Sequence, residues 1–380
     1  MKFVGALEGL RGYAALLMVV YHAWVLTGGP LLGGGRAVVS GGFLAIDLFF
    51  VLSAFVLLLP AARTGTFGSV KDYALRRAAR IVPAYYAALA IALIGFHAFA
   101  GPAADRRPPT LDGVLAHMTF LQVEARLLPG YDGALGFRVD PPLWTLSVEV
   151  AFYVVLPLIA LGFLRRPVLW LVVAFAATVV MRALALELAD TETADRLLSL
   201  PPMFAADFAA GMAGAWLFVR GVRVNPWLAL AGAVAVLYAS GAADAGTARL
   251  EARQSLWLAV AVPVAFGALV LAAASHGARW ADNPPARWLG KVSFGVFLFH
   301  FLVMLFCLNT LGFDRGTNAD FVALLAAGVA GSLAAGWLSF KLIEHPARVY
   351  VRRSSRTRPG SDPMPPAGSR PPEPESAASR

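Results

Sequence analysis

Long apolar runs separated by short polar segments dominate this 380-residue chain. Ten of them approach the length of about 20 residues that a helix needs to cross a bilayer. They cover residues 10–27, 41–60, 81–100, 144–164, 167–188, 204–220, 225–243, 256–275, 291–311 and 321–343. This pattern predicts an all-α fold, a polytopic membrane bundle of about ten transmembrane helices.

The segments outside these runs are short, apart from one loop and the C-terminal tail. The loop, 101–143, is rich in Pro, Gly and Asp, and its 117–128 portion is expected to form a short interfacial helix. Arg, Ser and Pro replace the apolar residues over 346–380, which predicts a disordered, basic cytoplasmic tail after a transmembrane domain of residues 1–345. No internal repeat or appended soluble domain is visible, so any chemistry is expected within the bundle.

Composition and charge support a membrane location. Hydrophobic residues make up 58% of the chain and charged residues 14%, whereas a soluble domain has about 25% charged residues. A net charge of +9 could suit nucleic acid, but the basic residues cluster between apolar runs, where they act as topology signals. About two thirds of the 32 basic residues fall on the side of the N-terminus. We therefore predict a multi-pass protein of the cell inner membrane, N-in and C-in, with no nucleic-acid partner.

Ionisable residues interrupt the first run, which is expected to be a retained span and not a cleaved signal. Arg11 and His22 share one helix face and lie about 16 Å apart along the axis. Two such groups on one stripe indicate a polar path into the membrane. The alternative is that Arg11 snorkels to the headgroups and His22 is a structural interior residue.

Two carboxylates enter the predicted membrane region at a depth comparable to that of His22. Asp47 belongs to the second run and Glu149 to the fourth, where Tyr153 follows on the same face. A histidine beside an acid can take a proton from a hydroxyl. His22, Asp47 and Glu149 are therefore the candidate catalytic residues, unless the acids only hold helices together.

A pair of arginines, Arg77 and Arg80, precedes the third run, one helical turn apart. Such a pair can anchor a span to lipid phosphate, and it also suits a phosphorylated ligand. His300 lies near the middle of the ninth run. The remaining histidines are expected at interfaces or in loops, as ordinary surface residues: His97, His117, His276 and His345.

Taken together, these elements resemble the acyltransferase 3 family of membrane acyltransferases, from about Leu7 to Pro346. The matching positions, in chain order, are Arg11 and His22; Asp47 to Ser53; Arg77, Arg80, Ile81 and Pro83; Trp144, Glu149, Phe152 and Tyr153; Ser293, Gly295 and His300; and Glu344 and Pro346. The departures are Ala54 for a glycine, Thr145 for a serine, and Phe294 and Phe297 for tyrosines. The methyl group of Ala54 is expected to tighten a helix contact without removing chemistry.

The resemblance implies an acyl-CoA donor, usually acetyl-CoA, supplied from the cytoplasm as a substrate, with no permanently bound cofactor. It implies a hydroxyl acceptor on an exported carbohydrate, lipid or metabolite. His22 would be the general base, assisted by Asp47 or Glu149, or else the carrier of an acyl-enzyme intermediate. The implied donor-binding residues are Arg11, Arg77 and Arg80, and substrate or structural support would come from Ser53, Trp144, Tyr153, Ser293, His300 and Glu344.

Two other functions compete with this interpretation. A transporter or exporter of a glycan or small polar substrate would use the intramembrane charges as a proton or substrate path. A structural or assembly protein would leave the polar elements unexplained. Nothing in the residues suggests a metal site, and the sequence leaves the acceptor and the oligomeric state open.

Overall fold

The computed structural model describes residues 2–29, 33–95, 110–128, 131, 140–187, 191–244, 255–276, 278–311 and 316–356. Its longer helices are α1 (Lys2–Leu26), α3 (Ala45–Thr64), α4 (Val70–Ile94), α8 (Trp144–Arg165), α9 (Pro167–Glu187), α11 (Ala205–Val219), α12 (Pro226–Asp244), α14 (Leu258–His276), α15 (Pro284–Leu311) and α16 (Asn318–Ser339). Within the described ranges, 10 helical segments are long and apolar enough to cross a membrane. The prediction of an all-α bundle with ten spans is confirmed.

Shorter elements connect these helices. They are α2 (Gly33–Ser40), η1 (Gly41–Leu44), α6 (Leu111–Met118), η2 (Glu124–Leu127), η3 (Pro141–Leu143), α10 (Thr191–Leu198), η4 (Pro201–Phe204), η5 (Phe340–Glu344) and α17 (His345–Arg356). In the described part of the 101–143 loop, α6 ends at Met118 and η2 is a short 3₁₀ turn. The prediction of one short helix over 117–128 is therefore wrong. Most of the rest of that loop lies outside the described residues.

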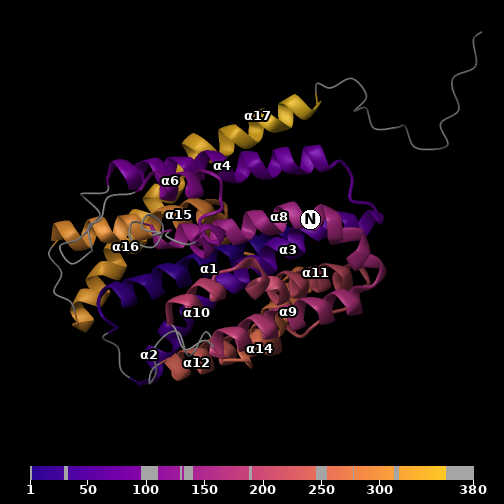
Figure 1. Cartoon of the computed structure of the whole chain (residues 1–380), viewed down its shortest axis with the longest axis horizontal. Coiled ribbons are helices and arrows are strands. Elements are labelled where there is room, and N and C mark those ends of the chain that lie inside the picture. Colours follow the sequence, from indigo (N-terminus) through magenta and orange to yellow (C-terminus); the bar gives the residue numbers. More distant parts are fainter. Residues whose placement is uncertain are drawn as a thin grey trace, which may run out of the picture.

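The helices are arranged around α1 and α3. Figure 1 shows these two near the middle, with α4 and α17 along one margin and α12 and α14 along the opposite one. Helix α1 packs along α15, α15 packs on α16, and α3 packs on α11. The central helices therefore place their polar residues inside the bundle, away from lipid.

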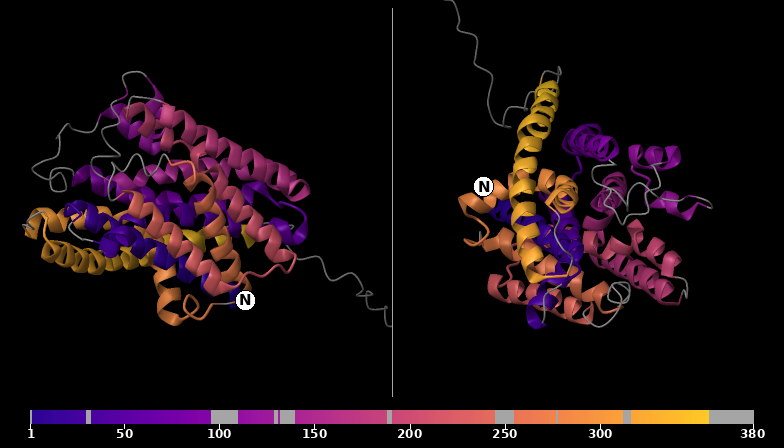
Figure 2. Two further views of the ribbon diagram at one scale, coloured as in Figure 1. Left: turned by 90° about the horizontal axis from the view of Figure 1, so that it is seen from below. Right: turned by 90° about the vertical axis from the view of Figure 1, so that its left-hand side faces the viewer.

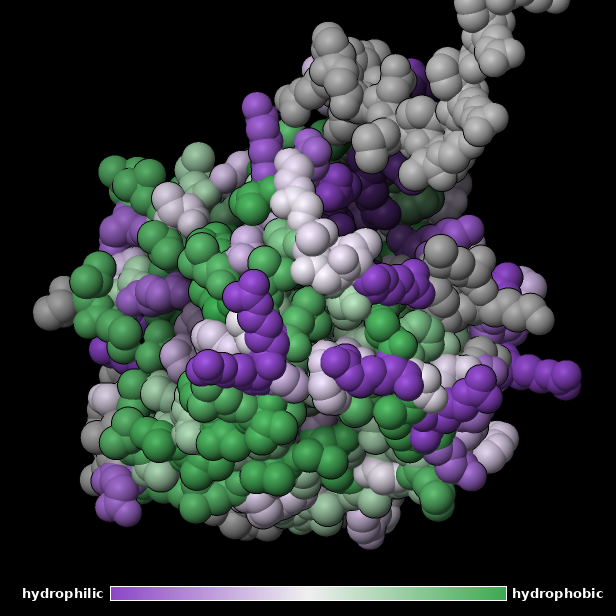
Figure 3. All heavy atoms as spheres, turned by 90° about the vertical axis from the view of Figure 1, so that its right-hand side faces the viewer, coloured by the Kyte–Doolittle hydropathy of each residue, from purple (hydrophilic) through white to green (hydrophobic). Residues whose placement is uncertain are grey.

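The outer surface of the bundle is apolar, as a lipid-facing surface must be. Val154 and Leu158 on α8 are 67% and 80% exposed, and Val168 on α9 is 70% exposed. Figure 3 shows hydrophilic side chains standing out from a largely hydrophobic face. Several helices thus bury one stripe in the bundle and offer the other to the membrane.

Two helices differ in extent from their predictions. Helix α4 begins at Val70, eleven residues before the predicted start, so Arg77 and Arg80 lie within the helix and not ahead of it. The chain also stays helical beyond Pro346, because α17 continues to Arg356, where a disordered tail was expected. Figure 2 shows α17 extending along the side of the bundle. The last residues, 357–380, lie outside the described residues.

Glycines allow the central helices to approach closely. A methyl group at Gly290 on α15 would lie 2.0 Å from the carbonyl oxygen of Glu8, and one at Gly12 would lie 2.9 Å from the amide nitrogen of Gly290. A methyl group at Gly211 on α11 would lie 2.8 Å from the Cβ atom of Ala54, which is fully buried. Ala54 thus occupies a tight helix contact opposite a glycine, as its methyl group was expected to do.

Gly290→Ala is expected to destabilise the bundle by about 1–3 kcal/mol, the cost of forcing extra volume into a packed contact. The cause is the backbone of α1, which cannot yield as a side chain can. Thermal unfolding in detergent measures the change. Gly232→Ala on α12 is the matched control, because no atom lies within 4 Å of the added methyl group. Equal unfolding temperatures for the two variants would contradict this account of the α1–α15 contact.

Candidate active site

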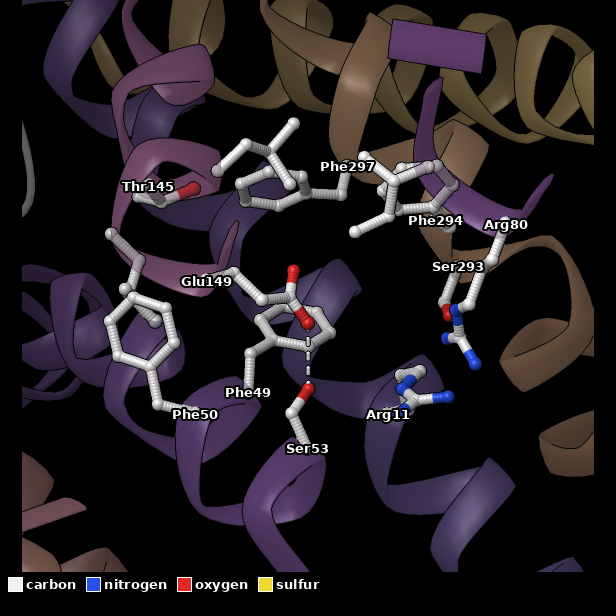
Figure 4. Close-up of a pocket in the computed structure, with 13 residues that line it drawn as sticks. Arg11, Phe49, Phe50, Ser53, Arg80, Thr145, Glu149, Ser293, Phe294 and Phe297 are labelled. Carbon is white, nitrogen blue, oxygen red and sulfur yellow. Dashed lines mark hydrogen bonds between the residues drawn. The ribbon is translucent and has the colours of Figure 1, made fainter. Parts of the chain in front are cut away.

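A polar cavity of about 40 Å³ opens between α1, α3, α4, α8 and α15. Its polar lining residues are Arg11, Ser53, Arg80, Thr145, Glu149 and Ser293. Figure 4 shows Glu149 near the centre of the site, with Ser53 below it, Arg11 and Arg80 to its right and Thr145 to its upper left. Four aromatic residues also line the walls: Phe49, Phe50, Phe294 and Phe297. The fold therefore brings residues from five separate helices to one enclosed polar site.

Glu149 is fixed by two hydroxyl groups. Ser53 donates a hydrogen bond of 2.8 Å to Oε1 of Glu149, and Tyr153, one turn further along α8, donates one of 2.5 Å to the same atom. Tyr73 on α4 in turn donates to the backbone carbonyl of Tyr153, at 3.2 Å. The predicted shared face of Glu149 and Tyr153 is confirmed. This network ties α3, α4 and α8 together around one carboxylate.

Three guanidinium groups gather at the same site. Arg11 and Arg80 line the cavity, and Arg77 lies one turn before Arg80 on α4. Arg11 interacts electrostatically with Arg77, Arg80 and Glu149. Within the part of the chain that the structure describes, none of the three arginines forms a direct ion pair with a carboxylate. Clustered buried cations repel one another and are costly without a counter-ion. The arrangement is therefore suited to an anionic ligand.

Two histidines form a second polar contact nearer the other end of the membrane. Nε2 of His300 on α15 lies 3.0 Å from Nδ1 of His22 on α1. Nδ1 of His300 is 2.7 Å from the carbonyl oxygen of Phe297, and Nδ1 of His22 is 3.1 Å from that of Met18. The apolar runs predict a helix around each histidine, but they do not predict that the two side chains meet.

The carbonyl contacts decide which ring nitrogens carry protons. A carbonyl oxygen can only accept, so Nδ1 of His300 must donate to Phe297. In a neutral ring, Nε2 of His300 is then an acceptor, and Nδ1 of His22 must donate to it. A neutral His22 therefore has its unprotonated nitrogen at Nε2. This tautomer leaves Nε2 with the lone pair that a general base needs.

The candidate catalytic residues occupy two layers, whereas one layer was expected. Glu149 shares the cavity with Arg11 and Arg80, while His22 lies about 16 Å from Arg11 along α1. On α15, Ser293 lines the arginine cavity and His300 meets His22 about 10 Å further on. The difference arises because the packing of the helices decides which residues meet. The depth in the membrane that is predicted for each residue does not specify this packing.

Asp47 lines a different, smaller cavity. This cavity, of about 30 Å³, also contains Trp144 and Arg182 in its wall. Asp207 on α11 is 2% exposed and interacts electrostatically with Asp47 and Arg182. Arg182 and Asp207 were not among the sequence candidates. A single charged residue inside an otherwise apolar run was the signal that could have found them.

Glu344 lies at the junction of α16 and α17. It is the last residue of the π-helical turn η5, and its side chain is buried. Glu344 pairs with Arg348 at 2.5 Å, accepts a hydrogen bond from Ser339 at 3.3 Å, and interacts electrostatically with Arg80. The last sequence element therefore faces the arginine site. Arg348 is a further residue that the sequence analysis did not single out.

The histidines outside the site differ in exposure. His276 and His345 are exposed, as expected, and His97 lies outside the described residues. His117 on α6 was expected at the surface, which is wrong, because it is 1% exposed. Its Nδ1 is 2.8 Å from the carbonyl oxygen of Gly113, and burial lowers the pKa of its imidazole. It is a buried structural histidine, one turn away from its hydrogen-bond partner.

Comparison with known proteins shows which family the chain belongs to. A family model described as an acyltransferase domain matches residues 4–338. A peptidoglycan O-acetyltransferase of Listeria monocytogenes is 25% identical over 91% of this chain and 56% of its own length. An acyltransferase of Streptomyces mycarofaciens is 28% identical over 93% of both chains. A protein of Komagataeibacter xylinus, provisionally named a membrane-bound transacylase, is 27% identical over 92% of this chain and 84% of its own.

No solved structure matches the chain. The chain spans little more than half the length of the Listeria relative. The family match covers nearly the whole set of membrane helices, and with it every polar residue described above except Ser339, Glu344, His345 and Arg348. It favours an acyltransferase over a transporter or an assembly protein. The chain belongs to the acyltransferase 3 family of multi-pass membrane proteins.

Proposed function

We propose that the protein transfers an acyl group, with acetyl as the expected one, from cytoplasmic acyl-CoA to a hydroxyl group presented on the outer side of the inner membrane. The observation that carries this proposal is the pairing of two sites along α1. A cavity lined by Arg11, Arg80 and Glu149 lies at one end, and a histidine pair lies about 16 Å away at the other. Both termini would then be cytoplasmic, as the distribution of basic residues predicts.

The arginine cavity would receive the donor. Arg11, Arg77 and Arg80 supply planar guanidinium groups, which bind phosphate oxygens through two parallel hydrogen bonds. Glu149, held by Ser53 and Tyr153, limits the repulsion among the arginines and fixes their positions. The thin pantetheine arm of the donor would extend along the α1–α15 face from Arg11 toward His22. The thioester would then reach the histidine pair while the phosphates stay at the arginines.

His22 would act as the general base. Its Nε2 removes the proton of the acceptor hydroxyl while the hydroxyl oxygen attacks the thioester carbonyl carbon. The carbon–sulfur bond then breaks, and the imidazolium returns the proton to the departing CoA thiolate. His300 holds the required tautomer through its contact with Nδ1 of His22. Asp47, on the neighbouring helix α3, would stabilise the positive charge on His22 during transfer.

The acceptor is proposed as an exported carbohydrate, lipid or metabolite that carries a hydroxyl group. One relative is named as acting on peptidoglycan, and the other two are named only as acyl-transferring proteins. The relatives therefore support acyl transfer, but they do not favour one class of acceptor. Trp144, beside Asp47 in the smaller cavity, offers an aromatic surface against which a sugar ring could lie. The neighbouring genes would indicate which of the three classes applies.

The test uses the purified full chain in lipid nanodiscs with acetyl-CoA labelled in the acetyl group. With a glycan fragment as acceptor, we expect release of free CoA together with transfer of label to the glycan. Omission of the acceptor is the control, and intact-mass analysis of that sample would reveal any acyl-enzyme on His22. Proton-coupled uptake of the glycan into liposomes without CoA release would contradict the proposal and favour a transporter.

A further inference from the structure

The charges around the donor cavity do not balance. Four guanidinium groups interact with one another there, because Arg348 on α17 joins Arg11, Arg77 and Arg80 through its electrostatic interactions with Arg77 and Arg80. The carboxylates that interact with these arginines are Glu149 and Glu344. Four positive charges therefore face two negative ones within the described residues. A partly buried cluster with this excess attracts a ligand with at least two negative charges.

The contacts of Arg348 hold its guanidinium group in place and leave part of the side chain exposed. One face of its guanidinium pairs with Glu344 at 2.5 Å, and its carbon lies 5.5 Å from the centre of the Phe340 ring. Its Nε atom is buried and makes no hydrogen bond. The side chain is 35% exposed, whereas that of Glu344 is fully buried. A ligand can therefore reach the guanidinium group of Arg348 but not the carboxylate of Glu344.

The backbone at this point directs the pair toward the cavity. The π-helical turn η5 inserts one extra residue per turn between α16 and α17 and contacts both α4 and α15. Helix α17 then packs against α4, the helix that carries Arg77 and Arg80. Single π-helical turns of this kind recur at functional sites because they rotate the side chains that follow. Figure 2 shows α17 beside the bundle and not detached from it.

From these observations we propose that Arg348 is a fourth phosphate-binding arginine of the donor site and that α17 is part of that site. The proposal rests on the proposed function and extends it, since it assigns a donor contact to a segment outside the matched family region. Arg348, whose side chain is partly exposed, would contact a phosphate group at the mouth of the cavity. Glu344 keeps its guanidinium in place when the site is empty.

The experiment measures acetyl-CoA affinity of the full chain in nanodiscs made of zwitterionic lipid. Arg348→Gln is expected to weaken binding about tenfold, the effect of losing one charge-assisted hydrogen bond. It should raise the KM for acetyl-CoA and leave kcat nearly unchanged, as for loss of a contact present throughout the reaction. Arg352→Gln, an exposed position on the same helix, is the matched control and should bind as the parent does.

A second variant separates donor binding from damage to the fold. Arg348→Gln leaves Glu344 buried without its partner, so Glu344→Gln/Arg348→Gln removes both charges together. If the double variant inserts normally and also binds acetyl-CoA about tenfold more weakly, the proposal holds. If either variant inserts normally and binds with parent affinity, Arg348 is a structural residue and the proposal is wrong.

Further outcomes distinguish a lipid phosphate from the phosphates of acyl-CoA, and failure of the proposed function from failure of the inference about Arg348. Parent-like acetyl-CoA binding by Arg348→Gln, combined with loss of preference for anionic lipid, would assign Arg348 to a lipid headgroup and overturn the proposal. Absence of acetyl-CoA binding by the parent itself would overturn the proposed function, and the inference with it. Loss of binding in Arg77 and Arg80 variants alone would overturn only the inference.

Discussion

Acyl transfer is expected to fall by roughly two to four orders of magnitude when His22 is replaced with alanine, the range for loss of a general base. The reason is the tautomer that the fold imposes. Nδ1 of His22 is directed at His300 and at the carbonyl oxygen of Met18, so Nε2 is the nitrogen that can take the hydroxyl proton. The substitution does not change Arg11, Arg77 or Arg80, which are the proposed donor-binding residues. Acyl-CoA binding should therefore stay close to that of the parent.

The measurement is the initial rate of label transfer from acetyl-CoA, made on variants with equal membrane insertion. His276→Ala is the matched control, because His276 is an exposed histidine at the end of α14. His300→Ala should be milder than His22→Ala, since His300 positions the base and does not itself accept the proton. Near-parent transfer by His22→Ala, with transfer abolished in His300→Ala, would move the base to α15.

Replacement of both Arg77 and Arg80 with lysine is expected to weaken acyl-CoA binding by about tenfold to hundredfold. Lysine keeps the positive charge, so topology and insertion should be preserved. It lacks the planar fork with which guanidinium binds two phosphate oxygens, and its shorter reach changes the position of the charge. The two arginines lie one turn apart on α4, so both can meet one polyphosphate group.

Equilibrium binding of acetyl-CoA to the purified double variant measures this effect. The control is the same exchange at Arg165 and Arg166, a second pair of arginines, which is exposed where α8 ends. The control pair should bind acetyl-CoA as the parent does, because neither residue lines the cavity or interacts electrostatically with Arg11, as Arg80 and Arg77 do. If the Arg77 and Arg80 variant inserts normally and binds with parent affinity, the arginines only anchor α4 and the donor site lies elsewhere.

The membrane helices were predictable because the bilayer imposes one simple rule on sequence. A span needs about 20 apolar residues, and each of the ten apolar runs overlaps a helical segment of the structure. Helix ends were less predictable. Charged residues such as Lys71 and Arg76 continue α4 outside the apolar core, where water can solvate them, so hydropathy underestimates the length of the helix. The same reason explains the helical extension to Arg356.

The sequence by itself also singled out several of the polar residues that the structure places inside the bundle. Arg11, Asp47, Glu149 and His300 stand out because a charged or titratable side chain in an apolar run is expensive unless it faces the bundle interior. Spacing on one helix was sufficient for neighbours such as Glu149 and Tyr153, which share a face and do form a hydrogen bond. Local periodicity thus specified which residues point inward and which of them are adjacent on one helix.

Only the tertiary structure decided how those residues group. Whether Glu149 meets His22 or Arg11 depends on the offset and rotation of α8 against α1, which the pattern of one helix does not contain. Those quantities are set by contacts such as Gly12 with Gly290, where the absence of side chains fixes how α15 lies on α1. The same packing brings His300 to His22 and Arg348 to the arginine cavity, across 278 residues in the first case. Distant pairs of this kind arise from the fit of helix surfaces, so the sequence supplied the chemistry and the packing supplied the geometry.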